Sequence, residues 1–134
     1  MYNIIGKESD NMSIEWFDSS SKDGIATLYE SNITLNKNTI RNIEDAYSVM
    51  LGIDAEKKQV VIKPLNKEQD MRGDIPQTHK YKITIRSSYG RIANKDFMRK
   101  IEKIGGFTLS VPKKFKTIYD DDNNLVIIDL GEER

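Results

Sequence analysis

The chain has 134 residues, of which 37% are hydrophobic and 31% are charged, and its 21 Lys and Arg balance its 21 Asp and Glu. These values are typical of one globular domain or of two closely packed half-domains, and a neutral chain can bind nucleic acid only through a local basic patch. The absence of cysteine excludes disulfides, thiol nucleophiles and cysteine-ligated zinc. No apolar run reaches the length of a signal peptide or membrane span, so we expect a cytoplasmic protein that is not membrane-bound.

The first half of the chain predicts strands and one short helix. The expected strands are β-branched or aromatic runs between turn residues, and they cover 12–17, 25–29, 33–35, 49–53 and 60–65. The first two form an N-terminal hairpin across the turn cluster at 18–24. Ile40, Ile43 and Tyr47 recur at spacings of three and four, which predicts a helix over 36–47. Asn36 or Asn38 is its expected N-cap.

A polar segment at 66–80, with Gly73 and Pro76 and no periodicity, predicts a linker. Beyond it the sequence predicts strands at 81–85, 107–111, 115–119 and 125–130, a loop or bulge at 87–93, and a helix over 94–104. The apolar stripe of this helix is expected to be Phe97, Met98, Ile101 and Ile104. The glycines at 105–106 should end it.

A weak internal repeat connects the two halves. Residues 36–43 read NKNTIRNI and residues 94–101 read NKDFMRKI, with four of eight positions identical. Each copy follows a β-branched run and precedes a predicted hairpin, which indicates a repeated unit. The predicted fold is therefore α+β and mostly β, with two strand–helix–hairpin pseudo-repeats after an N-terminal β-hairpin. The expected divisions are 1–65, the linker 66–80, and 81–134.

The predicted core comes from the apolar positions of these strands and helices. It consists of Ile33, Leu35, Ile40, Val61, Ile62, Ile83, Ile101, Val126 and Ile127.

Few residues suggest catalysis. His79 is the only histidine and lies in the polar linker, which favours a solvated loop residue over an acid–base catalyst. Asp120, Asp122 and Asn124 begin like a calcium loop, but the glycine and the final glutamate of such a loop are missing. No glycine pattern is typical of a phosphate-binding loop. We therefore expect no enzyme, no metal and no cofactor.

Basic residues near the two predicted helices are the remaining candidates. Lys37 and Arg41 are four residues apart, hence on one helix face, and Lys95 and Arg99 repeat this spacing. Together with Arg91 they could follow a phosphate backbone, which supplies most nucleic-acid affinity. The alternative is an ordinary solvated helix face, since Glu44, Asp45 and Asp96 dilute the charge.

The stretch SNITLNKNTIRNI at 31–43, followed by a hairpin ending in VVIKPL at 60–65, resembles the swapped-hairpin family of AbrB- and MraZ-type transcription regulators. Ile33, Leu35, Ile40, Arg41 and Ile43 fall on the family pattern, and the second half has its GRI at 90–92. The MraZ subgroup is similar in having two units in one chain.

The resemblance implies binding of duplex DNA through basic residues at the strand–helix junction, usually as an oligomer. The leading prediction is a bacterial or phage DNA-binding regulator that uses Lys37, Arg41, Arg91, Lys95 and Arg99. The alternative is a non-enzymatic protein-interaction module, such as an accessory or inhibitor protein of a mobile element.

Overall fold

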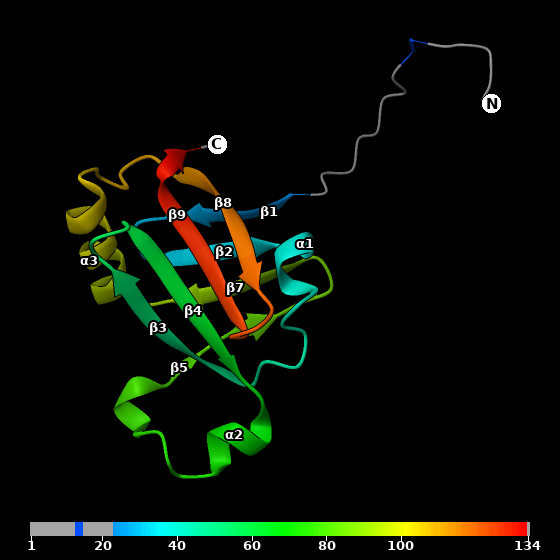
Figure 1. Ribbon diagram of the computed structural model, residues 1–134. Helices are drawn as coiled ribbons and strands as arrows, with labels where there is room; N and C mark the ends of the chain where they lie inside the picture. Colours follow the sequence, from blue (N-terminus) through cyan, green and yellow to red (C-terminus); the bar gives the residue numbers. More distant parts are fainter. Residues whose placement is uncertain (1–12, 15–22, 134) are drawn as a thin grey trace.

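The computed structural model describes residues 13–14 and 23–133 (Figure 1). Most of the strand expected at 12–17, and with it the N-terminal hairpin, lies outside these residues. The described strands are β1 (Gly24–Leu28), β2 (Asn32–Asn36), β3 (Ser48–Asp54), β4 (Gln59–Leu65), β5 (Tyr81–Lys82), β6 (Thr84–Ile85), β7 (Tyr89–Ala93), β8 (Lys113–Asp120) and β9 (Leu125–Glu133). The helices are α1 (Lys37–Ile40), α2 (Lys67–Met71), α3 (Lys95–Gly105) and the 3-10 helix η1 (Gln77–His79).

All nine of these strands belong to one antiparallel sheet in the order β5-β3-β4-β9-β8-β1-β2-β7-β6. The two outermost strands, β5 and β6, follow one another in the chain with only Ile83 between them. The sheet therefore curls round until it is nearly closed. This confirms the expectation of a mostly β fold, whereas α2 and η1 lie in the segment 66–80, for which the sequence predicted a linker and no helix.

The interior of the curled sheet is the core. Along β2, for example, Ile33 and Leu35 are buried and alternate with half-buried Asn32, Thr34 and Asn36, as expected when successive side chains point to opposite faces. The largest fully buried side chains come from seven different elements and the loops beside them, and include Leu28, Ile62, Ile92, Met98, Ile101, Phe115 and Ile128. Seven of the nine predicted core residues are buried.

The other two predicted core residues, Val61 and Ile127, are only half-buried. They are register partners in β4 and β9, and both point away from the interior because their neighbours Val60, Ile62, Val126 and Ile128 are buried. In a continuous β-branched run the inward and outward positions have the same kind of side chain. The sequence pattern therefore could not show that these two residues point outward, and their predicted burial is wrong.

Four strand pairings join the two halves of the chain: β1–β8, β2–β7, β3–β5 and β4–β9. In β2–β7 the partners include Ile33 with Ile92 and Leu35 with Gly90. Segments 23–65 and 81–133 thus share one sheet and one core. The segment 66–80 between them contains α2 and η1.

Helix α1 is shorter than the predicted 36–47. Asn36 caps it as expected, because its Oδ1 accepts a hydrogen bond from the Thr39 amide at 3.1 Å. After one turn the chain leaves the helix, and the Tyr47 amide donates to the Leu65 carbonyl at 2.7 Å. This bond starts the pairing of β3 with β4, so Tyr47 is half-exposed beside the sheet instead of lying on a helix face.

Helix α3 confirms the predicted helix at 94–104. Asn94 caps its start by accepting from the Phe97 amide at 2.9 Å, and Gly106 ends it with φ of 72°. That left-handed conformation suits glycine, which lacks the Cβ that would clash. Met98 and Ile101 are buried, so the inner part of the predicted stripe faces the core.

Two expectations in the second half are wrong. The segment 87–93 contains strand β7, whose inward positions are Gly90 and Ile92. A side chain at Gly90 would lie 2.9 Å from the Ile40 methyl carbon, so Ile40 takes the space that an apolar side chain would otherwise fill. The segment 107–111, predicted as a strand, has no regular structure. Its backbone is held by Glu102, whose Oε2 accepts from the Leu109 amide at 2.6 Å.

Candidate nucleic-acid interface

The predicted helix-edge residues lie in two separate places. Lys37 and Arg41 are exposed at α1, which follows β2, while Lys95 and Arg99 are exposed on α3, which follows β7. Because β2 and β7 are antiparallel neighbours, the two helices lie at opposite ends of this strand pair (Figure 1). The structure therefore does not bring the two basic pairs together, and a five-residue strand of about 17 Å separates the helix starts.

Arg91 lies between these ends, on the outer face of β7. Its register partners are Thr34 of β2 and Thr84 of β6. Thr34 is in turn opposite Thr27 of β1, and Thr27 is opposite Lys114 of β8. The result is a continuous row of outward side chains across five strands.

The next row along the same strands is also free of carboxylates. It places Lys116 opposite Ile25, and Tyr89 opposite Asn36. We call the six polar residues that dominate these two rows the threonine–basic face, which comprises Thr27, Thr34, Thr84, Arg91, Lys114 and Lys116. The three basic residues of this face are exposed and the three threonines are half-buried.

The predicted basic residues differ in whether they form an ion pair with an acidic side chain. Arg99 forms an exposed ion pair with Asp96 at 3.2 Å. Lys37, Arg41, Arg91 and Lys95 form no ion pair with any other described residue. Arg91 is thus a predicted site residue that belongs to the threonine–basic face and whose charge is unpaired among the described residues.

A second outward row of the sheet is apolar. Along the strand order, the β4–β9 pair lies halfway round the nearly closed sheet from the β2–β7 pair. Its outer face has a row that runs from Gly52 through Val61 and Ile127 to Ile118, and the Ile118 residue is 52% exposed. We call this row the apolar strip.

Sequence reasoning found Arg91 but missed the threonines and the two lysines of the same face, Lys114 and Lys116. Their signal is the alternation along each strand, since the threonines occupy the outward positions between buried residues. The strand pairing that collects them across five strands cannot be read from any single strand. His79, as expected for a loop residue, is exposed at the end of η1.

Comparison with protein-family models, curated proteins and solved structures finds no match for this chain. In the part of the chain that the structure describes, no helix is long and apolar enough to cross a membrane. The same residues contain no group of three or more His, Asp and Glu side chains placed to hold a metal ion.

Proposed function

We propose that this chain is a DNA-binding regulator that contacts the phosphate backbone of duplex DNA through the threonine–basic face. The observation that supports this best is the outward row Lys114–Thr27–Thr34–Arg91–Thr84, which contains basic and hydroxyl side chains and no carboxylate. Lys, Arg and Thr side chains provide many of the hydrogen bonds that proteins make to phosphate oxygens. A neutral chain can bind DNA in this way if its cations are gathered on one face.

The helix-edge residues extend this face in the proposed complex. Lys37 and Arg41 lie beyond one end of the β2–β7 pair, and Lys95 and Arg99 lie beyond the other. The roughly 17 Å between the helix starts equals about five phosphates along one DNA strand. Separate basic clusters at this spacing favour contacts with several phosphates of the DNA backbone over recognition of a single base.

We further propose that the chain consists of two strand–helix–hairpin units related by a pseudo-twofold axis. The strand order supports this, because exchanging β1 with β5–β6, β2 with β7, β3 with β8 and β4 with β9 leaves every pair of neighbours unchanged. The registers are consistent with an axis that passes between Thr34 and Arg91 on one side, and between Val61 and Ile127 on the other.

Local details support the same two units. Asn36 and Asn94 both cap a helix from the end of a strand. Both hairpins have an Asp before the turn that accepts a backbone hydrogen bond, Asp54 from Lys57 at 3.0 Å and Asp120 from Asn123 at 3.2 Å. The axis would pass beside Arg91, with one helix on each side. This arrangement suits the local twofold symmetry of duplex DNA.

Charge reversal on the threonine–basic face tests the proposal. Arg91→Glu and Lys114→Glu should each weaken binding to a mixed-sequence duplex by roughly tenfold and reduce the slope of log affinity against log salt by about 1. Fluorescence anisotropy at two salt concentrations measures both effects. Arg41→Glu and Arg99→Glu should weaken binding less, because they lie at the ends.

Lys57→Glu is the matched control, since Lys57 is exposed in the β3–β4 turn and the substitution changes the charge equally. Equal effects of Arg91→Glu and Lys57→Glu would contradict the use of this face. No binding by the unmodified chain near ~0.1 mM, the weak end of ordinary non-specific affinity, would contradict DNA binding altogether.

The apolar strip favours a second candidate, a protein-interaction module. Val61, Ile127 and Ile118 form an outward apolar row on β4, β9 and β8, which meets the threonine–basic face at β8. If a protein partner docks there, the substitution Ile118→Glu should abolish its capture in a pull-down assay. The substitution Arg91→Glu should leave that capture unchanged. The reverse pattern would favour DNA.

A further inference from the structure

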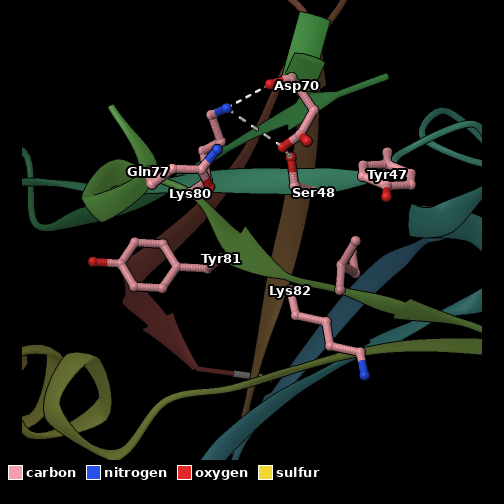
Figure 2. A pocket seen from close by; sticks show the side chains of 8 residues that line it. Tyr47, Ser48, Asp70, Gln77, Lys80, Tyr81 and Lys82 are labelled. Atoms are coloured by element: carbon pink, nitrogen blue, oxygen red, sulfur yellow. Dashed lines mark hydrogen bonds and ion pairs between the residues drawn. The ribbon is translucent and has the colours of Figure 1, made fainter. Parts of the chain in front are cut away.

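A pocket of about 420 Å³ lies where the segment 66–80 meets the sheet (Figure 2). Its lining includes Tyr47, Gln77, Lys80, Tyr81 and Lys82. This volume is within the range of small-molecule sites, which combine apolar walls with a few polar groups. Neither the threonine–basic face nor the apolar strip contributes to it.

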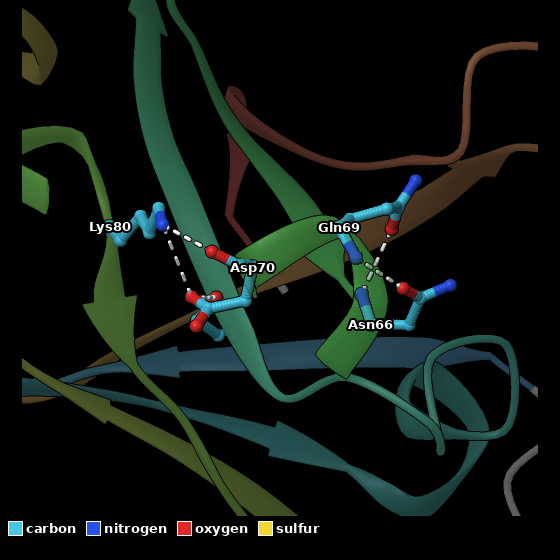
Figure 3. Close-up of polar contacts among 5 residues, drawn as sticks. Asn66, Gln69, Asp70 and Lys80 are labelled. Atoms are coloured by element: carbon cyan, nitrogen blue, oxygen red, sulfur yellow. Dashed lines mark hydrogen bonds and ion pairs between the residues drawn. The ribbon is translucent and has the colours of Figure 1, made fainter. Parts of the chain in front are cut away.

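The sequence builds this pocket through a short capped helix. Asn66 Oδ1 accepts from the Gln69 amide at 2.8 Å, and Gln69 Oε1 accepts from the Asn66 amide at 2.9 Å (Figure 3). This reciprocal pair is a capping box, which fixes α2 directly after β4 and orients Asp70. After Pro76, η1 returns the chain to Lys80 at the start of β5.

Lys80 is the central feature of the pocket. Its side chain is only 4% exposed, and its Nζ donates to the Asp70 carbonyl at 2.5 Å. The Asp70 Oδ1 lies 3.8 Å from Lys80 Nζ and accepts a hydrogen bond from Ser48 Oγ at 2.7 Å (Figure 2). At 3.8 Å the carboxylate attracts the ammonium but does not form a hydrogen bond with it.

Lys80 therefore keeps donor capacity. An ammonium group has three N–H donors, and among the described residues only the Asp70 carbonyl accepts one of them. A buried charge is stabilised only when good pairing and further hydrogen bonds compensate its desolvation. An anionic oxygen in the pocket would supply that compensation.

The other lining residues indicate the charge and shape of such a ligand. Lys82, the register partner of Ser48, adds a second cation, so the lining contains two ammonium groups and one carboxylate, that of Asp70. Gln77 adds an amide that can donate or accept. Tyr47, which is 50% exposed, and Tyr81 provide aromatic walls.

We propose that this pocket binds a small organic anion, with its carboxylate or phosphate near Lys80 and Lys82 and its ring beside the two tyrosines. This inference does not depend on DNA binding. The alternative is a purely structural role, in which the Asp70–Lys80 contact holds the segment 66–80 on the sheet. That alternative predicts that the pocket binds no anion.

Phenyl phosphate is a suitable probe because it combines one ring with one phosphate. Titrated into the ¹⁵N-labelled protein, it should cause saturable amide shifts at Ser48, Lys80 and Lys82 in heteronuclear NMR spectra. Phenol, the neutral ring alone, and inorganic phosphate, the anion alone, should each bind about tenfold more weakly or worse, which is the scale of one charge-assisted hydrogen bond.

Lys82→Gln is the decisive variant, since Lys82 is exposed and its replacement should leave the fold intact. It should weaken phenyl phosphate binding about tenfold, whereas Lys57→Gln on the distant β3–β4 turn should have no effect. Equal binding of phenol and phenyl phosphate would overturn the assignment to an anion, as would unchanged affinity in Lys82→Gln. Absence of saturable shifts up to about 10 mM would overturn the site itself, because a ligand of this size in a built pocket should bind more tightly.

Discussion

Ile101 attaches α3 to the interior of the sheet. Its side chain is fully buried and belongs to the same core cluster as Ile33, Val60 and Phe115, residues from three different strands. Ile118, on the outer face of β8, is an isoleucine in the opposite situation, with half of its surface exposed. The two residues allow the contribution of burial to be measured with the same chemical change.

Ile101→Ala should lower the free energy of unfolding by ~2–5 kcal/mol, because it removes buried methyl groups and leaves a cavity. Ile118→Ala should cost less than about 1 kcal/mol, since little surface is lost from the core. Chemical denaturation with urea measures both. A loss below ~1 kcal/mol for Ile101→Ala would mean that α3 does not stabilise the core.

At the scale of elements, the two asparagine N-caps differ in the number of hydrogen bonds that they form. Asn94 Oδ1 makes one capping bond, to the Phe97 amide. Asn36 Oδ1 accepts from the Thr39 amide and hydroxyl and also from the Ile25 amide, and its Nδ2 donates to the Asp23 carbonyl. Asn36 therefore caps α1 and also fastens β1 to β2.

Asn94→Ala should cost about 1 kcal/mol, the usual value of an N-cap. Asn36→Ala should cost at least ~1 kcal/mol more, because it leaves the Ile25 amide without its acceptor as well. Thermal or urea unfolding of both variants checks the order. Asn42→Ala, at an exposed position after α1, is the control and should change stability by less than about 0.5 kcal/mol.

The same elements show how far the sequence alone could predict the structure. Strands with branched residues on both sides of a turn, such as β3 and β4, are recognisable from local pattern. Strand β7 was not, because Gly90 occupies its inward position beneath Ile40. The candidate interface depends on the register of five strands, so only Arg91 could be named in advance. The pocket depends on Lys80 and Asp70, ten residues apart in a segment without periodicity.

At the scale of the whole molecule, the halves of the chain depend on one another. The pairings β2–β7 and β4–β9, together with β1–β8 and β3–β5, join strands of one half to strands of the other. Neither half alone can form the curled sheet around its inward side chains, since each half would keep two strand pairs that are not joined to each other. Segment 66–80 crosses between the halves and includes exposed Gly73.

Two fragments, residues 1–72 and 73–134, should therefore be unfolded separately and form native structure when mixed. Near-ultraviolet circular dichroism of each fragment and of an equimolar mixture measures this, with the uncut chain as reference. A native spectrum from either fragment alone would show that one half is an independent folding unit.

The near-closure of the sheet at Ile83 also affects the behaviour of the protein at high concentration. Open sheets expose unpaired backbone at their outer strands, which can recruit strands of other molecules. Here the short stretch of β5 and β6 pairs with both β3 and β7, so its detachment would uncover two such edges at once. Local opening of this one stretch, rather than global unfolding, is thus the event that we expect to control aggregation.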